Sequence, residues 1–213
     1  MDVVLSGLPR LGAGLLVTLG LITLGFAGAM VIGTPLAVCR VGPVRPLRIA
    51  AAGYVGALRN IPLLTLFALL VFGLPDIGIT LPLFVAAALG LALVGAAFVC
   101  EAVRGGIEAV PVGQVEAARA LGLTFGQTLH HVVVPVALRT MVQPIVNVFI
   151  GIALGSSVAA AIGVEDLTKA TQRLAIESAE AVVLFLVAGA VYVTIAACGA
   201  AVGGWLERRV RVR

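Results

Sequence analysis

Five long stretches of the chain contain no Asp, Glu, Lys or Arg, and they limit what the chain can fold into. They cover residues 11–39, 60–75, 77–100, 140–164 and 181–206. A helix that crosses the hydrocarbon core of a bilayer needs about 20 apolar residues. Only the second stretch is short. It reaches this length by extending back through residues 49–58, or it starts at Arg59 with the charge at the interface.

The composition supports the same fold class. Hydrophobic residues make up 61% of the chain and charged residues only 11%, whereas soluble domains carry roughly 25% charged residues. The polar surface is therefore too small for a globule in water. We predict an all-α, polytopic membrane protein, a single transmembrane domain over residues 1–213 with about five transmembrane helices.

Basic residues predict the orientation of these helices, because cytoplasmic segments are enriched in Lys and Arg. With the N-terminus outside and the C-terminus cytoplasmic, the outer segments hold only Arg10, Lys169 and Arg173 of the 14 basic residues. The inner segments hold the others: Arg40, Arg45, Arg48, Arg59, Arg104, Arg119, Arg139, Arg208, Arg209, Arg211 and Arg213. Attraction to the anionic inner leaflet explains the net charge of +4, so we expect no nucleic-acid partner.

The connection between the third and fourth spans, residues 104–139, is too long for a simple linker. Residues 113–121 are mostly good helix formers, and Gly122 follows where a helix end requires positive φ. Thr124 and Gln127 then have the spacing of a capping box, which begins a second helix. Pro135 is expected to stop or kink that helix. The pattern predicts a helix, a sharp turn and a helix at the cytoplasmic surface.

The first of these helices has the features of a docking element. Glu116 and Arg119 flank the small residues Ala117 and Ala118. Small side chains allow a partner surface to approach closely, and the charged neighbours fix its orientation. A helix that merely lies on the lipid surface is the alternative interpretation. It is weakened by a polar face with little Lys.

This loop resembles the EAA loop of binding-protein-dependent ABC import permeases, written E-A-A-x3-G-x9-I-x-L-P. The matching residues are Glu116-Ala117-Ala118, Gly122 and Val132-Val133-Val134-Pro135, with Val in place of Ile and Leu. Further segments resemble the polar amino acid branch, closest to glutamate-type permeases: Arg59-Asn60-Ile61-Pro62, residues 101–108, residues 111–114 and residues 162–167. Together these segments extend the resemblance over most of residues 11–207.

The resemblance implies an importer subunit in the bacterial plasma membrane. It implies a separate ABC ATPase dimer that binds ATP and Mg²⁺, an extracytoplasmic solute-binding protein, and a second permease, either homologous or another copy. The ATPase-coupling residues would be Glu116, Ala117, Ala118, Arg119, Gly122 and Pro135. The chain itself has no phosphate-binding loop, because its single Lys, Lys169, follows Thr168 rather than Gly. We therefore expect no cofactor, no metal and no enzymatic activity on this chain.

The substrate path is less well defined by the sequence. The branch usually carries Lys-Asp-Thr-Ser-Leu in the fourth helix, where this chain has Leu154-Gly155-Ser156-Ser157-Val158. Polar residues at membrane depth are the candidates for the path, although such residues often bond between helices instead. They are Thr65, Asn147, Ser156 and Ser157. Glu101 and Arg104 are expected to form a local ion pair, with a gate as the alternative.

Two glycine pairs are typical of close helix packing. Gly151 and Gly155 lie in the fourth span, and Gly199 and Gly203 lie in the fifth. We expect each pair to mark a packing face.

Two other functions fit the sequence less well. A secondary transporter or channel needs ionisable groups deep in the bilayer, and Glu101 is the only one well inside a span. An intramembrane serine protease would pair Ser156 or Ser157 with a histidine, but His130 and His131 lie in the predicted cytoplasmic loop. The sequence therefore favours the importer subunit, carrying a polar amino acid such as glutamate or glutamine.

Overall fold

The computed structural model describes residues 2–210 and consists of helices joined by short connections. Arg211 and Arg213, which the sequence assigns to the inner side, lie outside the described residues. The helices are α1 (Asp2–Val41), α2 (Arg45–Asn60), α3 (Leu63–Ala68), η1 (Leu69–Gly73), η2 (Leu74–Ile77), α4 (Leu83–Glu108), α5 (Val112–Ala120), α6 (Phe125–Thr128), η3 (Leu129–Val133), α7 (Val134–Gly155), η4 (Ser156–Ile162), α8 (Leu167–Ser178) and α9 (Ala181–Val210). The all-α prediction is confirmed.

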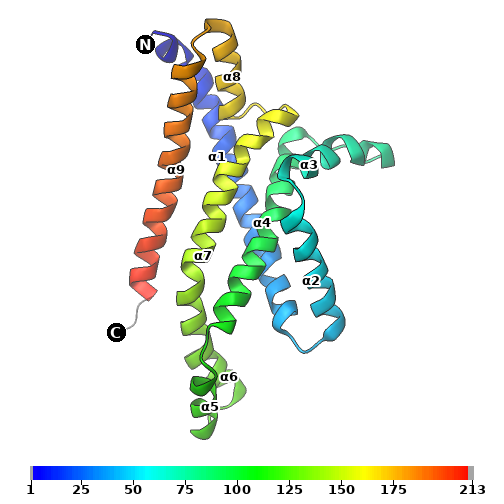
Figure 1. Ribbon diagram of the computed structural model, residues 1–213, viewed down its shortest axis with the longest axis vertical. Coiled ribbons are helices and arrows are strands. Elements are labelled where there is room, and N and C mark those ends of the chain that lie inside the picture. The colour runs from blue at the N-terminus through cyan, green and yellow to red at the C-terminus, as the bar shows by residue number, and fades with distance from the viewer. Residues whose placement is uncertain (1, 211–213) are drawn as a thin grey trace.

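Four long helical segments form the bundle. Val3–Val41, Leu83–Glu108, Phe125–Ile162 and Ala181–Arg209 are each long and apolar enough to cross a membrane. Helices α1, α4, α7 and α9 run along the long axis of the molecule (Figure 1). Large apolar side chains remain exposed on their outer faces, which suits a surface surrounded by lipid or by another apolar subunit.

The second predicted span is not one straight helix. Arg45–Asn60 and Leu63–Ile77 meet at a bend of 104°. Pro62 causes this bend, because proline forces the preceding residue out of the helical region, and Ile61 has φ −82° and ψ 131°. The segment from α3 to η2 consequently points away from the bundle (Figure 1). The predicted third span also begins later, at Leu83, after a left-handed turn at Gly78.

The two ends of the bundle differ as the basic residues predict. Helices α5 and α6, the α1–α2 connection and the C-terminal end of α9 lie at one end (Figure 1). The start of α1 and the whole of α8 lie at the other end. Helix α8 was not predicted as a helix. Asp166 begins it by accepting a hydrogen bond from the Lys169 N–H at 2.8 Å.

Close contacts at small residues hold the long helices together. A Cβ at Gly33 of α1 would fall 2.6 Å from the Ala96 carbonyl oxygen of α4. A Cβ at Gly199 of α9 would fall 2.5 Å from the Phe149 ring of α7, and Gly203 packs against Val146. The packing face predicted for the fifth span is therefore confirmed.

Candidate functional site

The elbow between α4 and α7, formed by α5 and α6, has the predicted turn. Gly122 has φ +77°. The Leu123 N–H donates to the Ala118 carbonyl at 3.1 Å, and the Gly122 N–H donates to the Arg119 carbonyl at 2.9 Å. These two bonds make a Schellman motif, which satisfies the last carbonyls of α5 and reverses the chain. The elbow is thus held by its own backbone.

The second half of the elbow departs from the prediction at Pro135. The capping box is present, since the Thr124 N–H donates to Gln127 Oε1 at 2.8 Å and the Gln127 N–H donates to Thr124 Oγ1. Pro135, however, lies in the first turn of α7 and does not end the helix. The π-helical turn Leu129–Val133 precedes it and gives the proline ring room beside the backbone. The elbow is therefore continuous with the span Phe125–Ile162.

The free surface of α5 is partly the one predicted. Glu116, Ala117 and Arg119 are exposed, whereas Ala118 is 4% exposed and packs inward. Ala118 therefore supports the elbow from within, and of these two alanines only Ala117 lies on the outer face.

Three exposed apolar side chains extend this surface: Val112 (70%), Leu121 (82%) and Phe125 (78%). They were not predicted, because apolar residues next to a membrane span carry no distinguishing signal in the sequence. Exposed apolar groups ringed by charges are typical of a protein-binding surface.

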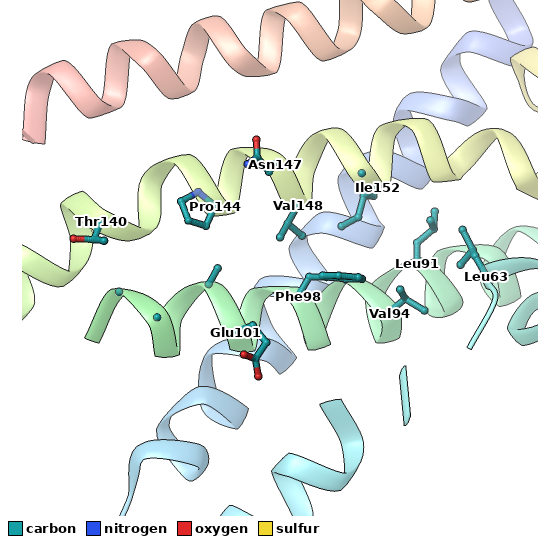
Figure 2. Close-up of a pocket in the computed structure, with 15 residues that line it drawn as sticks. Leu63, Leu91, Val94, Phe98, Glu101, Thr140, Pro144, Asn147, Val148 and Ile152 are labelled. Atoms are coloured by element: carbon teal, nitrogen blue, oxygen red, sulfur yellow. The ribbon is translucent and has the colours of Figure 1, made fainter. Parts of the chain in front are cut away.

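A groove of about 740 Å³ lies between α4 and α7. Val148 and Ile152 of α7 face Phe98 and Leu91 of α4 across it (Figure 2). The lining consists of Leu63, Leu91, Val94, Gly95, Phe98, Glu101, Ala102, Gly105, Gly106, Thr140, Pro144, Asn147, Val148, Gly151 and Ile152. The wall is mainly apolar, so the few polar groups would orient a bound solute.

Of the four residues predicted for the substrate path, the structure brings Asn147 to this groove. Ser156 is fully buried and donates to the Ala153 carbonyl at 2.7 Å, and Ser157 donates to the Leu154 carbonyl at 2.6 Å. Thr65 lies on an exposed face of α3. These three hydroxyls are not among the groove-lining groups.

Gly151 also differs from its prediction. It lines the groove, and a Cβ there would meet nothing within 4 Å, whereas a Cβ at Gly155 would lie 3.1 Å from Leu63. Of the predicted packing pair, Gly151 and Gly155, only Gly155 therefore marks a packing face.

Glu101 is the charged residue in the groove lining, and it joins three helices. Its carboxylate accepts from Arg104 Nη2 at 2.8 Å and from Arg40 Nη1 of α1 at 2.7 Å. Arg59 Nη1 of α2 lies 3.9 Å away. The sequence left Arg59 either within an extended second span or at the lipid interface, on the inner side. The wider cluster was not predicted, because Arg40 and Arg59 are 61 and 42 residues from Glu101 and meet it only when α1, α2 and α4 pack together.

The protein family of this chain follows from a match along almost its whole sequence. The family described as "Binding-protein-dependent transport system inner membrane component" matches residues 13–212. The chain belongs to this family. It is accordingly a multi-pass protein of the bacterial plasma membrane, as predicted.

Individual relatives agree with this assignment. The chain is 37% identical over 144 residues to a probable glutamine ABC transporter permease of Bacillus subtilis, covering 68% of this chain and 67% of that protein. It is 37% identical over 178 residues to a glutamate transport system permease of Corynebacterium glutamicum, covering 76% and 78%. It is 32% identical over 203 residues to an L-cystine transport system permease of B. subtilis, covering 95% and 87%. The predicted resemblance to the polar amino acid branch is confirmed.

Solved structures share the fold. A chain of an amino acid ABC transporter crystallised with histidines superimposes with a TM-score of 0.90 at 29% identity, covering 96% of each chain. A chain of the MetNI methionine ABC transporter has a TM-score of 0.78 at 23% identity, covering 95% of this chain and 97% of that one. The fold is that of type I ABC importer permeases.

Proposed function

We propose that this chain is one membrane-spanning half of an ATP-driven importer of polar amino acids, with glutamate or glutamine as its solute. A separate ATPase dimer binds ATP and Mg²⁺ and grips the elbow formed by α5 and α6. An extracytoplasmic binding protein delivers the solute, and a second permease completes the path. Family membership supports the importer, and the relatives described as glutamine and glutamate permeases support the solute.

The observation that carries the coupling role is the continuity of the elbow with α7. Its exposed surface combines Glu116 and Arg119 with apolar side chains such as Leu121. The helix that follows crosses the bundle and lines the groove through Asn147 and Ile152. A force applied to α5 is therefore passed through hydrogen-bonded helix to one wall of the groove.

Gly122→Val tests this role. A Cβ at Gly122 meets no atom within 4 Å, so the substitution acts only through the left-handed backbone, which a β-branched residue disfavours. We expect uptake to fall strongly while membrane insertion is unchanged. Gly122→Asn is the matched control, because Asn tolerates this conformation.

Glu116→Lys tests the docking surface itself. The side chain is exposed, so we expect normal insertion but loss of ATP-dependent uptake and of co-purification with the ATPase. The measurement is uptake of labelled glutamate, glutamine, arginine and histidine into liposomes that hold the assembled complex. Full transport by the Glu116→Lys complex, with the ATPase still bound, would refute coupling through the elbow.

The alternative is a secondary transporter or channel that needs no ATP. The same liposomes decide between the two. Uptake that persists without ATP and disappears when ion gradients are dissipated would favour the alternative.

A further inference from the structure

A second cavity adjoins the groove on the other side of α4. Its volume is about 470 Å³, and its lining is more polar than that of the groove. The residues that carry its chemistry are Arg40, Arg59, Asn60, Phe98 and Glu101. Phe98 and Glu101 line both cavities. These two side chains thus form the partition between the groove and the polar cavity.

The positive charges here exceed the negative ones. Arg40, Arg59 and Arg104 surround Glu101, and Arg104 is also paired with Glu108 at 2.5 Å. Three guanidinium groups therefore share two carboxylates. The Glu101 carboxylate points away from α7, out of the groove and toward the polar cavity (Figure 2).

Arg59 is the most weakly held of the three arginines. Its separation of 3.9 Å from Glu101 is beyond hydrogen-bond distance, because Arg40 and Arg104 already donate to the two carboxylate oxygens. Its guanidinium lies 5.4 Å from the centre of the Phe98 ring. Its side chain is 44% exposed, against 20% and 28% for the other two. A guanidinium in this state can still donate two parallel hydrogen bonds to a carboxylate, which is the geometry that it favours.

We propose that Arg59 binds a carboxylate group of the transported solute as the solute passes Phe98, and that Glu101 competes for the same arginines when the path is empty. The proposal rests on the proposed function and specifies its chemistry. The groove wall is mainly apolar and its one ionised side chain is an anion, so Arg59 is the cation that a carboxylate-bearing solute would meet beside it. A solute without a carboxylate would gain nothing from this residue.

The test is a binding measurement on the permease–ATPase complex in phosphatidylcholine nanodiscs. The probes are L-glutamate and its diamide, which has the same carbon skeleton and no carboxylate. We expect Arg59→Gln to weaken L-glutamate binding by at least about tenfold, the loss of one charge-assisted contact, and to leave diamide binding unchanged. Arg59→Lys should restore part of the affinity. Arg48→Gln is the matched control, because Arg48 is exposed on the same helix and lines neither cavity.

Glu101→Gln gives a second test with the opposite sign. It removes the competing carboxylate, so L-glutamate should bind several-fold more tightly while the diamide does not. A merely structural role for the cluster predicts weaker binding of both probes in both variants.

Three results would overturn the proposal: equal wild-type affinity for both probes, an Arg59→Gln effect on both alike, or an effect that appears only in phosphatidylglycerol nanodiscs. The last would show that the cavity binds a lipid phosphate.

ATP-driven uptake of L-glutamate distinguishes a failure of this proposal from a failure of the proposed function. If the wild-type complex transports and Arg59→Gln transports with unchanged KM, only the carboxylate site is wrong. If no amino acid is transported, the proposed function is wrong.

Discussion

Asp166 is a buried carboxylate outside the candidate spans, at the junction of η4 and α8. It is fully buried, and its Oδ2 atom has no hydrogen-bond partner among the described residues. Burial raises its pKa from 3.8 to about 6, although the hydrogen bond from the Lys169 N–H opposes the rise. The next residue is bound to the first span, since the Leu167 N–H donates to Thr18 Oγ1 at 3.0 Å. The start of α8 is therefore bound to α1 beside a carboxylate that is buried at an electrostatic cost.

The raised pKa of Asp166 makes the free energy of unfolding depend on pH, because proton binding and folding are linked. Between pH 4 and pH 6 the folded protein keeps a proton on Asp166 that the unfolded chain has lost, so the free energy of unfolding falls as the pH rises. We expect a higher Tm at pH 5 than at pH 7, with a contribution of at most about 3 kcal/mol. Asp166→Asn keeps the cap and removes this part of the pH dependence. The measurement is thermal unfolding of the purified protein at both pH values.

Glu165→Gln is the control for this prediction. Glu165 is the neighbouring carboxylate, half-exposed and paired with Arg173 at 2.5 Å. Its substitution should leave the pH dependence of Tm nearly unchanged. An Asp166→Asn protein that keeps the full wild-type pH dependence would contradict the assignment to Asp166.

At the scale of elements, the groove can be narrowed without disturbing the helices that form it. Gly151 of α7 lines the groove, and a Cβ there would meet nothing within 4 Å. Gly151→Leu should therefore reduce solute uptake while expression and Tm stay at or above the wild-type values, since Leu favours a helix more than Gly does. Gly189→Leu on α9 is the matched control. Gly189 also has free space around it and does not line the groove. Normal uptake by Gly151→Leu would mean that the solute takes another route.

The sequence predicted those elements whose signals are local. The long spans follow from apolar length, and the elbow follows from Gly122 and the Thr124 capping box. Other elements depended on how the chain meets its neighbours. Pro62 turns the chain by 104°, yet Pro135 is absorbed into a continuous helix by the π-helical turn before it. Proline alone does not distinguish these outcomes, because each depends on the backbone that surrounds it.

The candidate site was predicted less completely than the fold. Asn147 and Glu101 were singled out as polar groups in apolar spans, and both line the groove. Ser156 has the same character in sequence, but its hydroxyl bonds to its own helix. A polar residue in a span can satisfy either role. The partners of Glu101 on α1 and α2 could be found only from the packing of the three helices.

At the scale of the whole molecule, the polar face of α7 bears on where the proposed second permease would lie. Thr140, Gln143 and Asn147 are exposed and lie on one face of α7, at positions i, i+3 and i+7. Two of them line the groove. Polar side chains facing hydrocarbon are costly, whereas the exposed face of α9 around Val193 is apolar. We infer that the polar face of α7 looks onto a water-filled path shared with the second permease, and that α9 faces lipid.

Cysteine labelling of the assembled complex checks this arrangement. After Cys39, Cys100 and Cys198 are replaced by Ala, Gln143→Cys and Val193→Cys are compared with a charged, membrane-impermeant thiol reagent. The thiolate attacks the reagent, and the thiolate forms only where water reaches the sulfur. Gln143→Cys should react quickly and Val193→Cys slowly, although Val193 is 66% exposed in the single chain. The labelling rate of Gln143→Cys should also differ between the complex with its ATPase bound and the permease without the ATPase, because the elbow is continuous with α7. Equal rates at the two positions would place α7 in lipid and remove the case for a shared path.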